Sequence, residues 1–231
     1  MENLPDMKTV PKEAPSAGPE RKAAKRSGYR PAQQNRSAAS EKKLVQSAEM
    51  LFARHGYTHT KISDIIRESG VSTGTFYHRF SDKEGLLVVM MQRFVTQAGA
   101  LIAEWGQTAG RHESLHALLT SLGEIVFDTI TDRIGVYRAM QEVAQTIPDY
   151  WQAFGTLGDD LTRYTRHAVE NHRDEVTAAD IDLATRNAVQ VMLLLIIQTR
   201  LGAGIMFPES RDEFVPVVVQ AALGVLQPKE A

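Results

Sequence analysis

Apolar residues recur at intervals of three and four through almost the whole chain after residue 40, and no segment shows convincing strand alternation. In the first such segment Leu44, Ala48 and Leu51 share one helical face, and Gly56 stands where that helix should end. The same spacing, with capping residues, predicts further helices over 62–69, 73–79, 82–107, 112–130, 133–145, 149–173, 178–203 and 211–226. The chain is therefore predicted to be all-α, with about nine helices.

The first 37 residues lack this pattern. They contain five of the nine prolines and few apolar side chains, so they cannot bury enough surface to offset chain entropy. We expect a disordered basic arm over residues 1–37. Six cations in its second half are uninterrupted by any acid: Arg21, Lys22, Lys25, Arg26, Arg30 and Arg36.

The net charge of −2 conceals a strong asymmetry. Residues 21–83 hold thirteen Lys and Arg against five Asp and Glu, whereas residues 84–231 hold eleven against nineteen. A basic N-terminal third joined to an acidic remainder suggests that one end of the molecule contacts a polyanion.

The composition also indicates the cellular compartment in which the protein is expected to work. There is no cysteine, which excludes disulfides and thiolate metal sites, and no apolar leader is visible. The most apolar run, 189–197, has half the length that a bilayer requires, so we expect a buried helix and no membrane partner. A cytoplasmic location is the expectation that fits these features.

The most specific local signal is TKISDIIRESGVSTGTFYHRFSDKEGL, residues 60–86. Two short helices separated by Gly70 predict a helix-turn-helix, whose second helix can lie in a DNA major groove. Short hydroxyl side chains surround Gly74 on that helix, so its backbone can approach a groove closely. Donors suited to phosphate oxygens follow at Tyr77, His78 and Lys83.

Residues 40–86 resemble the DNA-binding domain of the tetracycline-repressor (TetR/AcrR) family of bacterial transcription regulators. The resemblance is carried by LFARHGYTHT, ISDI, SGVSTGTFYHRF and DKEGL, and it departs from the family pattern at Ile66 and Ser69, where alanine is common. It implies that Thr60 caps the first helix of the motif and touches phosphate, and that Thr73 and Thr75 reach base edges. The full set of candidate DNA-binding residues is Thr60, Lys61, Ser72, Thr73, Gly74, Thr75, Tyr77, His78 and Lys83.

The resemblance also implies a repressor in two parts, with a helix-turn-helix domain over 38–84 and a helical effector-binding and dimerisation domain over 85–231. Its expected partners are double-stranded DNA with a palindromic operator, an unidentified small apolar or aromatic effector, and a second copy of the chain. We expect the homodimer to form through 178–203 and 211–226, because 178–203 is apolar on more than one face. No cofactor is expected. The candidate effector contacts are Trp105, His116, Tyr137, Gln141, Trp151, Tyr164 and Asn187.

One motif points elsewhere. HESLH at 112–116 matches the H-E-x-x-H pattern of zinc peptidases, in which two histidines four apart on a helix bind the metal. Leu119 and Leu122 stand where a downstream glycine and a third histidine ligand would be, so we expect neither a metal site nor a catalytic site. Two alternatives stay open at this point: a constitutive architectural DNA-binding protein without an effector, and a zinc hydrolase that uses HESLH.

Overall fold

The computed structural model describes residues 35–145, 152–202 and 206–227. These residues form nine α-helices and two short 3-10 helices and contain no strand, which confirms the all-α prediction. The elements are α2 (Asn35–His59), α3 (Ile62–Ser69), α4 (Thr73–Phe80), α5 (Lys83–Thr108), η1 (Ala109–Arg111), α6 (Leu115–Asp132), α7 (Ile134–Ala144), α8 (Gln152–Glu170), η3 (Arg173–Glu175), α9 (Ile181–Arg200) and α10 (Arg211–Leu226). The predicted arm, apart from its last three residues at the start of α2, lies outside the described residues.

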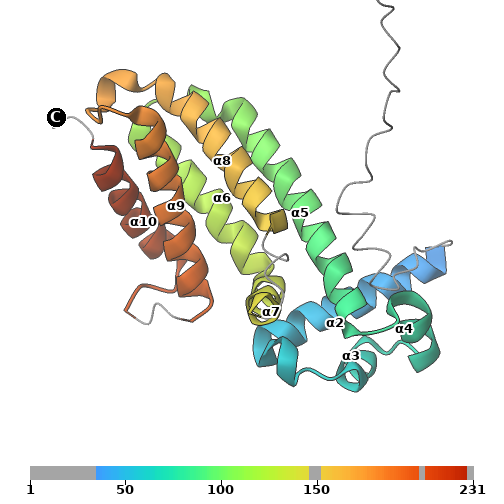
Figure 1. Ribbon diagram of the computed structural model, residues 1–231. Helices are drawn as coiled ribbons and strands as arrows, with labels where there is room; N and C mark the ends of the chain where they lie inside the picture. The colour runs from blue at the N-terminus through green and yellow to red at the C-terminus, as the bar shows by residue number, and fades with distance from the viewer. Residues whose placement is uncertain (1–34, 146–151, 203–205, 228–231) are drawn as a thin grey trace, which may run out of the picture.

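The helices are arranged as a small domain at one end of a longer bundle (Figure 1). Helices α2, α3 and α4 form the small domain, and α5 rises from it along the length of the bundle. Helix α7 lies across the lower end of the bundle, against α2, while α9 and α10 form the edge of the bundle farthest from α5. The end of the molecule that carries α3 and α4 is therefore built separately from the bundle but joined to it by α5 and α7.

A single hydrophobic core runs through both parts. Phe52 and Phe76 are completely buried in the small domain, and Leu86 and Leu87 at the start of α5 continue the same core into the bundle. Helices α5 and α9 are long and apolar enough to cross a membrane by length and composition alone, and both contribute buried residues to this core. Apolar burial of this kind is the main contribution to the stability of such a fold.

Local sequence determines where α5 begins. Asp82 is the N-cap, and its side-chain oxygen Oδ1 accepts a hydrogen bond from the Gly85 amide at 2.7 Å. Ser81 has φ of 60° and ends α4. The positive φ of Ser81 turns the chain between the two helices, so that α5 begins at Lys83 with Asp82 as its cap.

Candidate nucleic-acid interface

Helices α3 and α4 are joined by a turn that depends on Gly70. This residue has φ of 64° and ψ of 16°, a left-handed conformation that glycine adopts at little cost, and its amide donates to the Ile66 carbonyl at 3.1 Å. The Ser69 hydroxyl donates to the same carbonyl at 3.0 Å and accepts from the Val71 amide at 3.2 Å. Serine at this position thus contributes two hydrogen bonds to the turn that an alanine could not form.

Helix α4 buries one face and exposes the other. Phe76 and Phe80 are completely buried, whereas Thr73, Gly74 and His78 are exposed and Tyr77 is 50% exposed. Because the two sets lie on opposite sides of the same short helix, the exposed side chains form one continuous face. The hydroxyl of Ser72 accepts from the Thr75 amide at 3.2 Å, so Ser72 is the N-cap of this helix. Thr75 is half-buried beside it, with its hydroxyl 2.9 Å from that of Ser72.

Gly74 has no internal partner. A Cβ atom added at this position would meet nothing within 4 Å. Neither packing nor backbone conformation inside the chain therefore requires a glycine on this face. The absence of a side chain leaves the backbone of α4 open to close approach from outside, as recognition in a major groove requires.

The opposite face of α4 is held by a buried ion pair. Arg79 is 3% exposed, and its Nε lies 3.4 Å from Oε2 of Glu41 in α2, which is also 3% exposed. Arg93 of α5 binds the other oxygen of the same carboxylate. Arg79 is therefore not available as a phosphate contact, because its guanidinium is enclosed between three helices.

The structure gives Thr60 a different role from the predicted one. The N-cap of α3 is Lys61, so the prediction that Thr60 caps this helix is wrong. Thr60 is 2% exposed, and its hydroxyl donates to the Gly56 carbonyl at 2.7 Å. The left-handed Gly56, with φ of 77°, ends the regular part of α2 and turns the Thr60 hydroxyl inward, away from any phosphate. Lys61 is exposed and is available for the contact that was assigned to its neighbour.

Lys83 also has partners inside the chain. Its ammonium donates to the Tyr57 carbonyl at 2.7 Å and to the Thr60 carbonyl at 3.0 Å, and lies 4.1 Å from the centre of the Tyr57 ring. Burial lowers the pKa of Lys83, although Glu142 nearby acts in the opposite direction. The lysine thus closes the carboxyl end of α2, and one of its three N–H donors is left for a phosphate.

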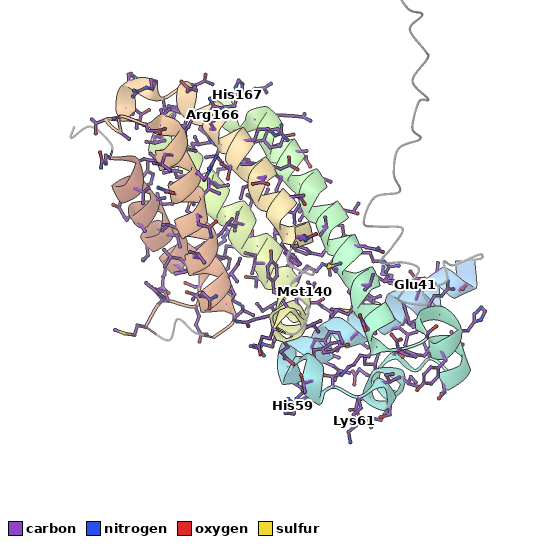
Figure 2. All side chains as sticks on the ribbon, in the orientation of Figure 1. Glu41, His59, Lys61, Met140, Arg166 and His167 are labelled. Atoms are coloured by element: carbon purple, nitrogen blue, oxygen red, sulfur yellow. The ribbon has the colours of Figure 1, made fainter. Side chains whose placement is uncertain are left out.

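His59 is an exposed residue that the candidate DNA-binding set does not include. Figure 2 shows His59 and Lys61 together at the lower tip of the small domain, pointing away from the bundle. His59 is exposed, and its charge acts on the pKa of Glu142. The signal that could have found it is Gly56, because a glycine three residues earlier ends the helix and brings the following turn to the surface.

The bundle contains an apolar cavity of about 90 Å³ between α5, α6, α7, α8 and α9. Three aromatic rings pack together in its wall: Phe94 and Phe154 are stacked with centroids 5.3 Å apart, and Tyr137 lies 5.1 Å from each. Among the lining side chains of the described residues, only Tyr137 and Thr129 carry hydroxyl groups. Burial raises the pKa of Tyr137, so its phenol is a neutral hydrogen-bonding group at any physiological pH.

Of the seven residues predicted to contact an effector, Tyr137 lines this cavity. Trp151 lies outside the described residues. The others are placed elsewhere: the Trp105 indole donates to Ser121 at 3.0 Å, His116 and Asn187 are exposed, and Gln141 and Tyr164 are half-buried away from the cavity wall. Residue type alone could not identify the wall, because its other members are mostly ordinary apolar residues and come from four different helices.

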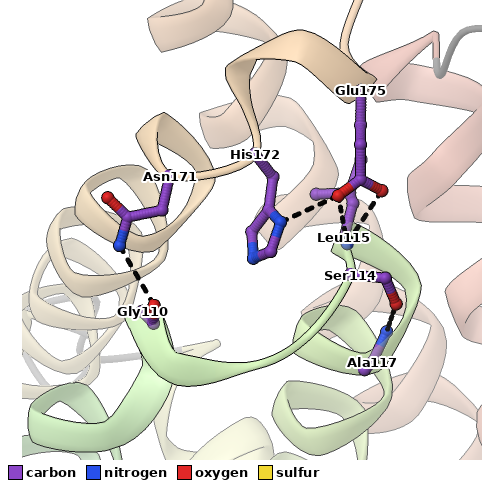
Figure 3. Close-up of polar contacts among 7 residues, drawn as sticks. All are labelled: Gly110, Ser114, Leu115, Ala117, Asn171, His172 and Glu175. Atoms are coloured by element: carbon purple, nitrogen blue, oxygen red, sulfur yellow. Dashed lines mark hydrogen bonds and ion pairs between the residues drawn. The ribbon is translucent and has the colours of Figure 1, made fainter.

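HESLH does not lie on one helix. Helix α6 begins at Leu115, and His112 is in extended conformation before it, so the two histidines do not share a helical face. Figure 3 shows the reason: Ser114 caps α6 by accepting from the Ala117 amide at 3.2 Å, and Glu175 accepts from the Leu115 amide at 3.0 Å. No group of three metal-ligating side chains is present among the described residues. The geometry that the zinc reading needs is therefore missing.

Part of the chain matches a known protein family. Residues 44–90 match the family model described as bacterial regulatory proteins, tetR family. The HTH-type transcriptional regulator EthR of Mycobacterium tuberculosis is 24% identical over 135 residues, which are 58% of this chain and 62% of EthR, so the chain spans about three fifths of that relative. The HTH-type transcriptional repressor ComR of Escherichia coli is 34% identical over 76 residues, 33% of this chain and 34% of ComR.

The fold has solved counterparts. A bacterial regulatory protein in the tetR family from Rhodococcus RHA1 has a TM-score of 0.62 and 17% sequence identity, covering 83% of this chain and 98% of its own. A chain from Mesorhizobium loti described as a TetR-family regulator has a TM-score of 0.64 at 19% identity, covering 84% and 98%. At these identities the likeness concerns the fold of both domains.

Proposed function

Because the chain is a TetR-family transcriptional regulator, we propose that it is a dimeric, cytoplasmic repressor that binds a palindromic operator and is released from it by an apolar or aromatic effector. The observation that carries the DNA-binding part is the exposed face of α4, where Thr73, Gly74, Tyr77 and His78 lie together and no internal packing requires the glycine. On this proposal Thr73 reads base edges, while Lys61 and Tyr77 bind phosphates.

The exposed surface of α9 and α10 supports the proposal that the protein forms a homodimer. Leu183 and Leu194, three turns apart on α9, are 52% and 49% exposed, and Val217 of α10 is 38% exposed. Exposed large apolar side chains are typical of protein interfaces, and a two-fold axis beside α9 and α10 would give an isologous four-helix contact. A dimer with this symmetry would place two copies of α4 on two half-sites of DNA.

The apolar cavity in the bundle supports the proposal of a small-molecule effector. Its volume of about 90 Å³ is below the roughly 300–1,000 Å³ that ligand sites usually have. An effector of ordinary size must therefore move helices apart as it enters, and so would bind an altered arrangement better than this one. A ligand with such a preference shifts the protein toward the arrangement that it binds. If that arrangement misplaces the two α4 helices, DNA affinity falls by the same coupling.

The proposal is tested by selecting duplexes from random DNA with the full-length protein and then measuring affinity for the enriched sequence. We expect a palindrome whose half-site centres are about 34–36 Å apart, one turn of B-DNA. Enrichment of no sequence would contradict a sequence-specific regulator. The comparisons do not favour the zinc-hydrolase reading, since the similar proteins named above are transcriptional regulators.

A second experiment separates the repressor from the constitutive architectural protein. Apolar and aromatic compounds that raise the melting temperature are titrated into the complex of protein and selected operator. We expect at least one to lower operator affinity several-fold or more, equivalent to a coupling of about 1–3 kcal/mol. Compounds that stabilise the protein without ever changing operator affinity would favour the architectural alternative.

A further inference from the structure

The turn between α2 and α3 is held by a carboxylate from the bundle. Glu142, near the end of α7, accepts hydrogen bonds from two successive backbone amides of this turn, at 3.0 Å from Tyr57 through Oε1 and at 2.7 Å from Thr58 through Oε2. Burial acts to raise the pKa of Glu142, but the hydrogen bonds from Thr58 and Tyr57 and the nearby His59 outweigh it and lower the pKa. Glu142 is therefore a carboxylate at neutral pH, and charged acceptors form the stronger class of hydrogen bond.

Gly56 makes this contact possible in two ways. Its φ of 77° and ψ of 168° are adopted with ease only by glycine, and they point the next two amides toward α7. In addition, a Cβ atom at Gly56 would lie 2.3 Å from Oε1 of Glu142. The turn is thus shaped for the carboxylate, both in its backbone and in the space beside it.

A second helix of the bundle holds the same turn from its carbonyl side. Lys83, the first residue of α5, donates to the Tyr57 and Thr60 carbonyls. The amides of the turn are therefore bound by α7 and its carbonyls by α5. Both helices also line the apolar cavity, α7 through Tyr137 and α5 through Phe94, whose rings are in contact.

The first residues of α7 are also hydrogen-bonded to α2. Oε1 of Glu49 accepts from the amides of Gly135 at 2.7 Å and Val136 at 3.2 Å, and Arg138 donates to the Ala53 carbonyl. A Cβ atom at Gly135 would lie 2.1 Å from the Glu49 carbonyl oxygen, so the two backbones are in direct contact. These contacts oppose sliding of α7 along α2, and Glu142 is the contact that joins α7 to the turn.

We propose that Glu142 is the positioning residue through which occupancy of the cavity reaches the DNA-binding face. When a ligand moves α7, the carboxylate carries the Tyr57 and Thr58 amides with it. The residues that follow, His59 and Lys61, stand at the exposed tip of the small domain, and Lys61 is the N-cap of α3 (Figure 2). The orientation of α3 and α4 is thereby set by α7. This inference rests on the proposed function, since it assigns the coupling between the two proposed sites.

The test replaces the unknown ligand by a side chain. A Cβ atom at Gly158, in the cavity wall on α8, would have only Leu193 near it, at 4.0 Å, so Gly158→Leu partly fills the cavity. Gly155→Leu is the matched control, because Gly155 lies on the same helix, is exposed and has nothing within 4 Å. Each is combined with Glu142→Gln and, as a control for loss of one charge, with Glu170→Gln on the exposed surface of α8.

Affinity for the selected operator is measured for every combination. We expect Gly158→Leu to weaken binding by roughly tenfold in the native and Glu170→Gln backgrounds but less than about twofold with Glu142→Gln. Distant, independent substitutions would instead combine additively to within about twofold in affinity. Gly155→Leu should change affinity in no background. Amide hydrogen exchange provides a direct readout: the Tyr57 and Thr58 amides should exchange faster in Glu142→Gln and in no control.

Two results would overturn the inference. One is an equal loss of affinity from Gly158→Leu with and without Glu142, and the other is no loss in the native background. Failure of the native protein to select any operator would instead refute the proposed function. If Glu142→Gln does not fold, Glu142→Asp serves as the second variant, because a side chain one methylene shorter cannot span both amides; the same loss of coupling is expected, and full coupling would refute the role of Glu142.

Discussion

At Gly74 the proposed interface can be tested by adding a single carbon. Nothing within 4 Å of an added Cβ opposes Gly74→Ala, so the melting temperature should stay the same or rise, since alanine favours helix over glycine by up to about 1 kcal/mol. The methyl group would nevertheless stand between the α4 backbone and the groove. We expect operator affinity to fall by roughly tenfold, or about 1.4 kcal/mol. Gly155→Ala, exposed and equally open, is the control, and an unchanged affinity for Gly74→Ala would move the groove contact elsewhere.

A pair of substitutions separates base contacts from phosphate contacts. Thr73→Ala is expected to change which operator bases are preferred, because one base contact discriminates by about 1–3 kcal/mol. Lys61→Ala should weaken all sequences alike and make the salt dependence shallower by about one unit. Lys83→Ala is unsuitable for this purpose, because it also removes two hydrogen bonds that close α2. Competition titrations at several salt concentrations measure both effects. If Lys61→Ala changed which operator bases are preferred, Lys61 would be a base contact and not a phosphate contact.

Between elements, the orientation of α4 depends on the carboxylate of Glu41. Glu41→Gln leaves the guanidinium of Arg79 buried at 3% exposure without its counter-charge. Removing one partner of a buried pair costs about 3–5 kcal/mol, so we expect a loss of this order in the free energy of unfolding. Glu104→Gln, on the exposed surface of α5, should change it little. Urea unfolding measures both, and a loss for Glu41→Gln no larger than the control would show that the pair is solvated.

The stability of the contact between α2 and α7 should depend on pH through two carboxylates, Glu142 and Glu49, whose pKa values are shifted in opposite directions. The pKa of Glu142 is lowered from its ordinary value of about 4.5, so the stability it contributes is present above that value and is lost as pH falls through the lower, folded-state pKa. Burial, opposed by hydrogen bonds from Val136 and Gly135, raises the pKa of Glu49, so ionising Glu49 costs stability as pH rises. Thermal melts between pH 3 and 7 should show Glu142→Gln destabilised at neutral pH and approaching the native protein in acid. The reverse trend would contradict the assignment.

The elements differ in how far the sequence could predict them. Helices α3 and α4 match their expected ranges closely because Gly70 and Ser72 are local signals. The start of α6 was placed three residues early, although the local signal for it is Ser114, a residue type favoured at N-caps. The partner of Arg79 lies in another helix, and so does Glu142, which accepts from the two amides after Gly56. Such contacts depend on how helices pack, which local periodicity does not encode.

At the scale of the whole molecule, local periodicity also could not predict which faces of α9 and α10 are buried and which are exposed. The apolar pattern predicted that 178–203 is covered on two sides, and α9 does bury Ala188, Met192 and Ile196 against the protomer while exposing Leu194. Periodicity alone could not say which residues of α10 face outward, and Val218 is completely buried whereas its neighbour Val217 is 38% exposed. A charge at Val218 would therefore unfold the protomer and would report nothing about assembly.

The dimer is accordingly tested at the exposed face, with Leu194→Asp and Val217→Asp. A charge in the proposed interface should shift the protein toward monomer in sedimentation at micromolar concentration without lowering the protomer's helical content. Operator affinity should fall with it, because a monomer occupies one half-site and loses the second set of contacts. Gln198→Asp, exposed one turn beyond Leu194, provides the control for added charge at the margin of this face. A native protein that sediments as a monomer and binds a half-site singly would refute both the interface and the palindromic operator that follows from it.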